Sequence, residues 1–340
     1  MEIFCSVPSG GYPITIGRGA LSKAGSLFRL DRKVLILTDD GVPRAYAEAI
    51  AAAAKAPYIE VVPQGEGSKS FPVYERVLSR MLALGFSRKD CIVSVGGGVP
   101  SDLAGFCAAT YMRGIDFYTV PTTVLSAVDA SIGGKTALNL DGIKNIVGAF
   151  YQPKGVLIDP DTFLSLPDRQ VSNGLAEAVK MALTFDADLF RLFEKEDDPM
   201  ARIEEIVARS VDLKRIVVER DEREQNLRRV LNFGHTIAHG IESAAHGTLY
   251  HGECVAIGML PMCAPAVRER LLPVPQKLRL PTDTALDPDE IYAALLHDKK
   301  ADAETVAVTR VETVGSYVME TVPVSSLRPL IDTVIRKETV

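Results

Sequence analysis

Short apolar runs alternate with helical stretches over the first half of the chain. Four of these runs are rich in β-branched residues and are bounded by turn formers, which is typical of buried strands. They are Lys33–Thr38, Tyr58–Pro63, Asp90–Val95 and Phe117–Pro121. Between them, Val42–Lys55 and Phe71–Leu84 carry apolar residues at helical spacing together with good helix formers. This alternation predicts a parallel sheet covered by helices.

The pattern changes after Gly155–Asp159, where helical spacing predominates and strand signals become rare. Helices are expected at Glu177–Phe193, Ala201–Glu219, Leu231–Ala245 and Gly252–Arg270. Thr305–Thr309 and Ser316–Thr321 alternate as one hairpin would, and the Pro-rich stretch Leu272–Pro281 is expected to be a surface loop. We therefore predict an α/β domain with a Rossmann-like parallel sheet over residues 1–160, followed by a mainly α-helical domain over residues 161–340.

The composition is that of a globular protein, and it narrows the classes of function. A net charge of −6 argues against a chain whose main partner is nucleic acid or an anionic membrane. No apolar run approaches the roughly 20 residues that a membrane span needs, and the first residues lack the pattern of a signal peptide. Five scattered cysteines without a CxxC pair indicate reduced thiols, so a cytoplasmic protein is expected.

Three consecutive glycines, Gly96–Gly98, directly follow the apolar run CIVSV and precede a helical stretch. Glycines at a strand end allow the backbone to approach a pyrophosphate, and the next helix N-terminus offers free N–H groups. The run is not the GxGxxG fingerprint, and a simple tight turn explains it equally well.

Other strand ends carry polar residues that favour a nucleotide site. Asp39 follows the first run, where it could accept a hydrogen bond from a ribose. Gly65–Lys69 follows the second run, and Thr122 and Thr123 follow the fourth. The threonine pair would also serve as an ordinary helix cap. Because these loops meet at one edge of a parallel sheet, together they indicate a nucleotide site.

Four of the five histidines lie between residues 235 and 251. His235 and His239 share a predicted helix face with Asn232, and His251 begins the next segment. Glu177 lies upstream on another predicted helix. Two imidazoles and one carboxylate form the ligand set of an open catalytic zinc site. Spacing alone does not select the ligands, since a histidine in an apolar helix is commonly a packed core residue.

Several cations and amides are flanked by glycine or apolar residues, which suits the binding of a phosphate or carboxylate. An ordinary solvated surface would explain many of them. They are Lys135, Lys144, Asn145, Lys180, Lys214, Arg228 and the pair Lys299-Lys300.

At this level of detail the chain resembles the 3-dehydroquinate synthase family over roughly residues 30 to 322. The motifs that carry the resemblance are GGGVPSDLAGFCAATYMRGIDFYTVPTTVLSAVDASIGGKTALNLDGIKNIVGAFYQP, TFLSLPDR, NGLAEAVK, RDEREQNLRRVLNFGHTIAHGIE and HGECVAIGM. The resemblance implies a dehydroquinate synthase-like fold and a homodimer. It also implies conversion of 3-deoxy-D-arabino-heptulosonate 7-phosphate, a phosphorylated keto-acid sugar, to 3-dehydroquinate and phosphate.

The resemblance further implies one NAD and one divalent metal, zinc with cobalt as an alternative, and it assigns residues to each ligand. The metal ligands would be Glu177, His235 and His251. NAD would lie against Asp39, Glu66, Lys69, Gly97, Gly98, Asp102, Thr122, Thr123, Lys144, Thr162 and Ser165. The substrate would meet Asp129, Lys135, Asn145, Lys180, Lys214, Arg228, Asn232 and His239, with Lys299 or Lys300 at its phosphate and Arg113 supplied by the partner subunit.

In the implied reaction, NAD takes a hydride from the substrate and later returns it. Phosphate leaves in between by elimination, and the substrate's own phosphate can accept the proton. Ring opening and an intramolecular aldol step close the carbocycle. Lys135, Asn145 and His239 would hold the departing phosphate, while Lys214 and Arg228 would pair with the carboxylate.

The sequence departs from the usual family pattern at a few positions. Pro100 and Ser101 replace the common Ile-Gly after the glycines, Ala238 replaces a common glycine, and Cys254 replaces a common alanine. The Glu66 loop lacks the usual aromatic residue before its lysine. None of these changes removes a charged group or a ligand, so they bear on rates and cofactor affinity.

Three other functions remain open at this stage. One is a sugar-phosphate cyclase that acts on a different sugar, and another is a metal-dependent polyol dehydrogenase that consumes NAD stoichiometrically. The third is an NAD-binding scaffold protein without activity. Against the third, the predicted ligands and cations are all present together.

Overall fold

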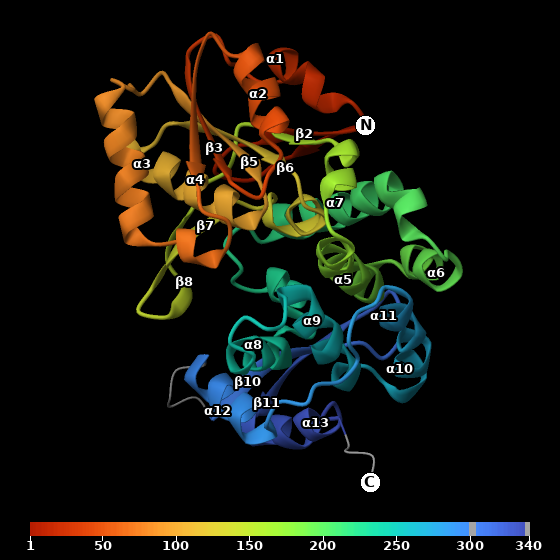
Figure 1. Ribbon diagram of the computed structural model, residues 1–340. Coiled ribbons are helices and arrows are strands. Elements are labelled where there is room, and N and C mark those ends of the chain that lie inside the picture. Colours follow the sequence, from red (N-terminus) through yellow and green to blue (C-terminus); the bar gives the residue numbers. More distant parts are fainter. Residues whose placement is uncertain (299–303, 337–340) are drawn as a thin grey trace. The chain divides into compact units, whose positions relative to one another are not determined.

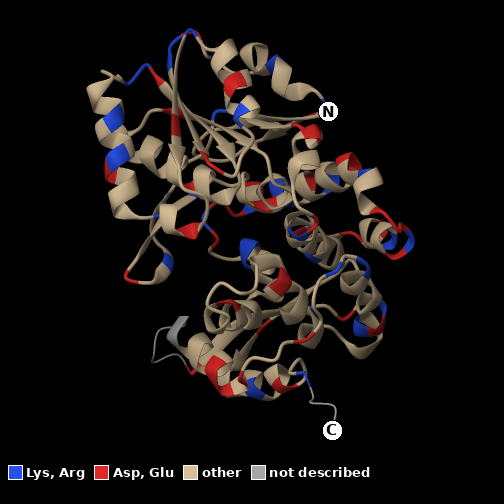
Figure 2. Cartoon of the chain, in the orientation of Figure 1, with Lys and Arg blue, Asp and Glu red and all other residues tan. Residues whose placement is uncertain are grey.

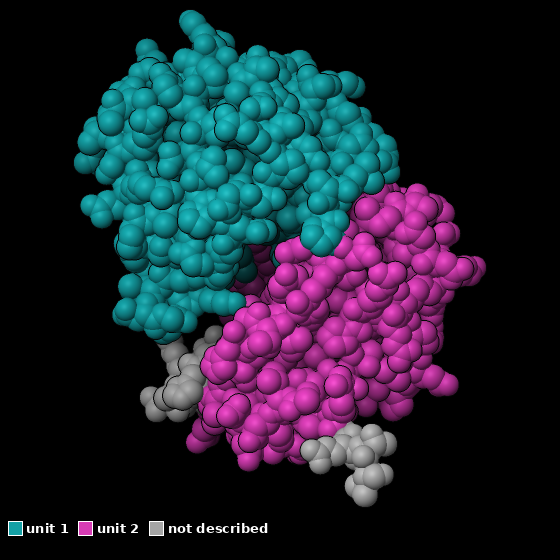
Figure 3. Space-filling model, viewed as in Figure 1, with its two compact units in different colours: residues 1–167, 214–223 teal, residues 168–213, 224–340 magenta. Residues whose placement is uncertain are grey.

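The chain forms two compact units in the computed structural model, which describes residues 1–298 and 304–336 (Figure 1). Unit 1 comprises Met1–Pro167 and Lys214–Arg223, and unit 2 comprises Asp168–Leu213 and Glu224–Val340 (Figure 3). The periodicity gave no sign that a short segment from the helical half belongs to unit 1. The domain boundary near residue 160 stays a prediction.

Unit 1 is built on a seven-stranded sheet in the order β1-β2-β9-β6-β5-β3-β4 (Figure 1). β1 pairs antiparallel with β2, and every other pair in the sheet is parallel. The four predicted strands are confirmed as β3 to β6, so the predicted α/β class is correct. The strands are β1 (Glu2–Cys5), β2 (Tyr12–Ile16), β3 (Lys33–Asp39), β4 (Ala56–Val62), β5 (Cys91–Gly96), β6 (Asp116–Pro121) and β9 (Val156–Ile158).

Helices cover both faces of this sheet. Val34 and Ile36 of β3 pack with Ala47 and Ile50 of α2, whereas Leu35 of the same strand packs with α3 and α4. The predicted helices are confirmed as α2 (Arg44–Ala53) and α3 (Phe71–Ala83). The remaining helical segments are η1 (Ala20–Lys23), α1 (Ala24–Leu27), η2 (Glu66–Ser68), α4 (Gly98–Thr110), η3 (Tyr111–Arg113), η4 (Ser126–Ala130) and η5 (Pro160–Ser165).

A second, two-stranded sheet in unit 1 consists of β7 (Lys135–Leu140) and β8 (Ile143–Phe150). Leu138 of β7 belongs to the same apolar cluster as Leu103 of α4, so the hairpin packs on that helix. Lys144 therefore lies on strand β8.

Unit 2 is mainly helical and carries one hairpin, as predicted. The hairpin consists of β10 (Thr305–Arg310) and β11 (Val318–Pro323), paired antiparallel. The helical segments are α5 (Asp168–Phe185), α6 (Ala187–Lys195), η6 (Pro199–Arg202), α7 (Ile203–Arg220, which continues into unit 1), η7 (Leu227–Asn232), α8 (His235–Ala244), α9 (His251–Met259), η8 (Leu260–Met262), α10 (Pro265–Leu271), α11 (Pro273–Lys277), α12 (Pro288–Asp298), η9 (Val324–Leu327) and α13 (Arg328–Asp332).

Three predicted helices are divided in the structure, and each break has a local cause. Asp186 ends α5 and caps α6, so Glu177–Phe193 is two helices. Gly234, with φ of 76°, separates η7 from α8. Pro265 starts α10 anew after α9. The predicted surface loop Leu272–Pro281 was also wrong, since it contains α11, whose Val274 is buried.

Charged residues of both signs occur in each unit (Figure 2). Lys and Arg are interspersed with Asp and Glu over the elements of each unit (Figure 2). Among the described residues, no helix combines the length and apolarity required for a membrane span. All five cysteines are buried free thiols.

Candidate active site

Three helices of unit 2 bring together one carboxylate and two imidazoles. Glu177 comes from α5, while His235 and His251 are the first residues of α8 and α9. Glu177 Oε1 lies 3.3 Å from His251 Nε2 and 3.5 Å from His235 Nε2. One potential ligand atom from each residue lies within 4.8 Å of the others. The three residues named by the family motif therefore meet at one point.

The environment of Glu177 fits a bound cation. The residue is 1% exposed, and neither of its carboxylate oxygens has a hydrogen-bond partner among the described residues. The ammonium of Lys180, itself 2% exposed, forms an ion pair with this carboxylate. Burying a carboxylate is costly unless cationic or donor groups face it, so this site suits a positively charged ligand. Two imidazole nitrogens and one carboxylate form a three-ligand set that leaves a position open on zinc.

The pKa values of the three groups are displaced in different directions. Burial alone would raise the pKa of Glu177, but Lys180 and the two imidazoles hold it well below its usual range. Burial, reinforced by Lys180, lowers the pKa of His235 to about 3, so its ring is neutral. Burial works against the charge on His251, yet contacts with Glu177 and Glu242 raise its pKa to about 10. A metal at this site would therefore displace a proton from His251.

Glu242 is a contact that the sequence analysis missed. Its Oε2 lies 2.9 Å from Nδ1 of His251, on the opposite side of the ring from Glu177. A carboxylate at Nδ1 holds the proton there and leaves Nε2 free to bind a metal. Glu242 lies seven residues after His235 on α8, on the same face, but spacing alone does not single out one carboxylate on a helix surface.

The N-terminus of α9, which carries His251, is fixed by several contacts. The N–H of Gly252 donates to Asn173 Oδ1 at 2.6 Å. A Cβ at Gly252 would lie 2.0 Å from the backbone oxygen of Asn173, so only glycine allows this approach. Glu253 accepts from the Tyr250 N–H at 2.8 Å and from Arg169 through both carboxylate oxygens. These contacts define where His251 points.

The other predicted substrate residues of unit 2 take varied positions. The ring of His239 lies 5.5 Å from that of His235 and 6.3 Å from that of His251, measured between centroids. Arg228 is buried in η7. Asn232 does not share a helix with His235, because Gly234 interrupts the chain; its side chain is exposed and donates to Glu224 at 3.0 Å. Lys299 and Lys300 lie outside the described residues.

In unit 1, the turn Gly96–Gly98 connects β5 to α4 at the carboxyl edge of the sheet. Gly96 has φ of 155°, and a Cβ there would lie 2.7 Å from Cγ of Pro100. Gly97 is the N-cap of α4 and offers no side chain to its first turn. The N–H groups of that turn thus remain available to an anion such as a pyrophosphate.

The loops after the neighbouring strands also end at this edge, as expected for parallel pairs. Asp39 is buried at the end of β3, and its carboxylate accepts from the Gly41 N–H at 2.9 Å. Burial is the main cause that raises the pKa of Asp39. Thr122 is buried after β6, and Thr123 accepts from the Ser126 N–H at 3.1 Å, which confirms its predicted capping role.

Lys69 is the centre of a polar cluster in unit 1. Its ammonium lies 2.7 Å from Asp102 and 3.4 Å from Glu66, and it also contacts Oδ1 of Asn145. Lys69 is only 4% exposed. Burial raises the pKa of Asp102 to about 6, although Lys69 acts in the opposite direction. Three predicted ligand-binding residues thus meet around one buried cation: Glu66 of its own loop, Asp102 of α4 and Asn145 of β8.

The remaining predicted residues of unit 1 are less closely gathered. The ammonium of buried Lys214 lies 2.7 Å from Oδ1 of Asp129. On η5, Thr162 is buried and Ser165 is exposed, and the Tyr46 hydroxyl lies 3.2 Å from Ser165 Oγ. Three cations are exposed: Arg113, Lys135 and Lys144.

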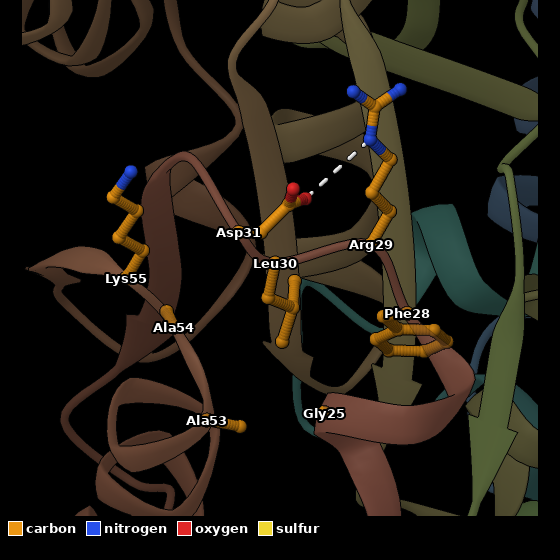
Figure 4. Close-up of a pocket in the computed structure, with 8 residues that line it drawn as sticks. All are labelled: Gly25, Phe28, Arg29, Leu30, Asp31, Ala53, Ala54 and Lys55. Carbon is orange, nitrogen blue, oxygen red and sulfur yellow. Dashed lines mark ion pairs between the residues drawn. The ribbon is translucent and has the colours of Figure 1, made fainter.

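A pocket of about 420 Å³ in unit 1 lies away from these groups (Figure 4). Its lining is made by Gly25, Phe28, Arg29, Leu30, Asp31, Ala53, Ala54 and Lys55. Leu30 and Asp31 precede β3, and Lys55 precedes β4, so the pocket lies at the amino edge of the sheet. Ligands of parallel sheets bind at the carboxyl edge, and this pocket is therefore not the candidate site.

Sequence models of 3-dehydroquinate synthase match two adjoining parts of the chain, the N-terminal one over residues 59–173 and the C-terminal one over residues 174–301. The 3-dehydroquinate synthase of Enterococcus faecalis is 38% identical over 353 residues, covering 98% of this chain and 99% of that protein. That of Methylacidiphilum infernorum is 40% identical over 334 residues, covering 93% and 92%.

Solved structures of related synthases share the fold. A 2-deoxy-scyllo-inosose synthase complexed with carbaglucose-6-phosphate, NAD+ and Co2+ has a TM-score of 0.89 and 27% identity, and the match covers 98% of this chain and 100% of that one. A 2-epi-5-epi-valiolone synthase from Streptomyces hygroscopicus, with NAD+ and Zn2+ bound, has a TM-score of 0.87 and 28% identity, with 95% and 96% covered. With relatives of 38% identity over nearly its whole length, the chain belongs to the 3-dehydroquinate synthase family.

Proposed function

We propose that this protein is a 3-dehydroquinate synthase that converts 3-deoxy-D-arabino-heptulosonate 7-phosphate to 3-dehydroquinate and phosphate. The observation that carries the proposal is the cluster of Glu177, His235 and His251, in which a buried carboxylate faces two imidazole nitrogens. Membership of the family supplies the reaction. The implied cofactors are one NAD and one divalent metal, zinc in the first place and cobalt as the alternative.

The residues around these groups have separate tasks. When bound, NAD would exchange a hydride with the substrate, and the metal would polarise the substrate hydroxyls as a Lewis acid. Lys180 carries a positive charge beside Glu177, so it can orient a substrate hydroxyl and stabilise negative charge there. We assign Lys135, Asn145 and His239 to the phosphate of the substrate, and Arg228 with Lys214 to its carboxylate.

The cofactor assignment draws on unit 1. The first turn of α4, after Gly96–Gly98, has no side-chain cap, so its N–H groups suit a pyrophosphate. Asp39 and the loops after β4 and β6 lie along the same edge of the sheet. Thr162, Ser165 and Lys144 complete the set that we assign to NAD. The two synthases compared above contain NAD+ together with Co2+ or Zn2+, which supports this cofactor pair.

Another sugar-phosphate cyclase activity is the second candidate, and the high TM-scores of 0.89 and 0.87 favour it structurally. The sequence relatives favour the dehydroquinate reaction, since their identity of 38% to 40% exceeds the 27% and 28% of those structures. A probable glycerol dehydrogenase with a TM-score of 0.61 is only 18% identical and shows the fold alone.

A substrate comparison tests the proposal. The purified protein, supplied with NAD and zinc, is offered the heptulosonate phosphate, a hexose 6-phosphate or glycerol. We expect inorganic phosphate and 3-dehydroquinate from the first substrate only, without net NADH, and no phosphate after chelation of the metal. Cyclisation of the hexose phosphate alone would establish the other cyclase activity. Accumulation of NADH with glycerol would establish a dehydrogenase.

We further propose that the enzyme works as a homodimer in the cytoplasm. Five buried thiols without disulfides suit a reducing compartment. Arg113 is exposed, so it is available to a partner subunit. Sedimentation should give twice the mass of the chain, and Arg113→Ala should raise the KM for the heptulosonate phosphate. A monomer with full activity would contradict the dimer.

A further inference from the structure

The side-chain amide of Asn139 is bonded on both sides within unit 1. Its Nδ2 donates to Glu66 Oε1 at 2.9 Å, and its Oδ1 accepts from the backbone N–H of Asn145 at 2.9 Å. Its own N–H donates to the backbone oxygen of Lys69 at 2.8 Å. One half-buried residue on β7 thereby ties the loop after β4 to the start of β8.

These contacts form a closed ring of hydrogen bonds and ion pairs that includes the Lys69 ammonium. Glu66 lies 3.4 Å from Lys69 Nζ, and Oδ1 of Asn145 contacts the same atom. The side-chain amide of Asn139 bonds to both of these residues. Glu66 and Asn145 therefore each have one contact to the cation and one to Asn139, and the ring fixes both.

The turn between β7 and β8 and the start of β8 need such a restraint because their backbone is unusual. Asp141, Gly142 and Asn145 have φ of 51°, 80° and 57°. A non-glycine residue in this left-handed region costs free energy and persists where its surroundings determine it. The bond from the Asn145 N–H to Asn139 is a direct restraint on that conformation.

We infer that Asn139 is a positioning residue that sets Glu66 for the cofactor and Asn145 for the substrate phosphate. The inference rests on the proposed function, which assigns Glu66 and Lys69 to NAD and Asn145 to phosphate. Loss of the amide frees the Glu66 carboxylate and lets Asn145 leave the left-handed region. Asn139 itself needs to touch neither ligand.

Two substitutions separate the two bonds of the amide. Asn139→Asp keeps an oxygen for the Asn145 N–H but removes the donor to Glu66 and places two carboxylates together. Asn139→Ala removes both bonds. Asp141→Asn is a matched control, since it exchanges a carboxylate for an amide at an exposed position of the same turn. Asparagine also tolerates the positive φ of that position.

Three measurements on the whole protein test the inference: the Kd for NAD by calorimetry, amide hydrogen exchange at Asn145 without ligands, and KM and kcat for the heptulosonate phosphate. Both Asn139 variants should weaken NAD binding about tenfold or more. Only Asn139→Ala should speed exchange at Asn145 and raise the KM strongly. Asp141→Asn should match the wild type in all three measurements.

The measurements distinguish a positioning role of Asn139 from a purely structural one, and both from a failure of the proposed function. If the Asn139 variants lose thermal stability but keep the NAD Kd, the exchange rate and the KM of the wild type, the residue is only structural and the inference fails. If Asn139→Ala does not fold, Asn139→Asp still tests the bond to Glu66. If the wild type binds NAD but turns over no heptulosonate phosphate, the proposed function fails, while the NAD and exchange measurements still decide the role of Asn139.

Discussion

Glu177 is held as a buried anion by its neighbours on three helices. Lys180 lies one turn away on α5, and the imidazoles of His235 and His251 approach Glu177 Oε1 from α8 and α9. A metal would replace the imidazole contacts with coordinate bonds and use the lone pairs that have no hydrogen bond. The negative charge of Glu177 therefore matters more to the metal than its shape.

Glu177→Gln should test this, because the amide has nearly the same shape but no charge. We expect the variant to fold and to lose its metal on dialysis, together with its phosphate-releasing activity. Metal content per chain and the zinc Kd by competition with a chelating dye are the measurements. Glu290→Gln, at an exposed position of α12, is the control. One tightly bound zinc in the Glu177 variant would show that this carboxylate is not a ligand.

Glu242 should affect the metal without touching it. Because its carboxylate bonds Nδ1 of His251, Glu242→Gln weakens the restraint on the ring and on its tautomer. Substitutions of such outer residues commonly cost about 10- to 100-fold in metal affinity. We expect a loss of this size in the zinc Kd, with circular dichroism unchanged. An unaltered Kd would leave Glu242 as a surface charge only.

At the residue scale, family motifs predicted more than residue types could. Glu177, His235 and His251 were selected by the motif, whereas spacing alone left several histidines as candidates. Glu242 was missed, although it lies in the same motif as His235, because a carboxylate on a helix surface is ordinary. Its role appears only when α9 places His251 against α8.

Asp186 shows how one residue divides an element. Its Oδ1 accepts from the N–H groups of Asp188 and Leu189, at 3.1 and 3.0 Å, and so begins α6. Arg209 donates to the same carboxylate through its Nε and Nη2 atoms. Burial would raise the pKa of Asp186, but Arg209 and the two N–H groups lower it below its usual value.

Asp186→Ala should therefore lower the free energy of unfolding by about 1–3 kcal/mol at neutral pH, from a lost cap and a lost partner for Arg209. The folded pKa is below the unfolded one, so this stabilisation is present above pH of about 4 and is lost as the pH falls through the folded pKa. Urea titrations at several pH values measure it. Asp186→Asn should keep the cap and lose only the charge-dependent part. A difference from the wild type that grows in acid would contradict the argument.

At the element scale, strands β3, β5 and β6 were predictable because both of their faces are buried, which requires continuous apolar runs. The ends of the helices were harder to predict from the sequence. The breaks at Asp186 and Gly234 depend on single residues inside amphipathic stretches that read as continuous. The β7–β8 hairpin was missed, since Ile143 and Ile146 are exposed and the two strands have no clear alternation with the core.

At the scale of the whole molecule, the proposed ligands divide between the units. All three residues that we assign to the metal belong to unit 2, and the residues that we assign to NAD belong to unit 1. Each ligand should therefore slow amide exchange in its own unit. We expect zinc to protect α5, α8 and α9, and NAD to protect the loops after β3, β4, β5 and β6.

Zinc binding should also raise the free energy of unfolding by a measurable amount. At a zinc concentration of about 100 times its Kd, the free energy of unfolding should rise by about 2.7 kcal/mol if only the folded state binds. Glu177→Gln should remove most of this gain. Protection by zinc that appears only in unit 1 would overturn the assignment of the metal ligands.

The segment Lys214–Arg223 belongs to unit 1 although it follows part of unit 2 in the sequence. It therefore limits where the chain can be cut into separate fragments. A fragment that stops at Pro167 would lack Lys214, the partner of Asp129, and Glu219, which accepts from the Ser6 N–H at 2.7 Å. It would also lack Glu222, which accepts from Gln152 at 3.0 Å. No single cut yields both units intact. Chimaeras between family members that exchange one half for another thus require matched junctions on both sides of this ten-residue piece.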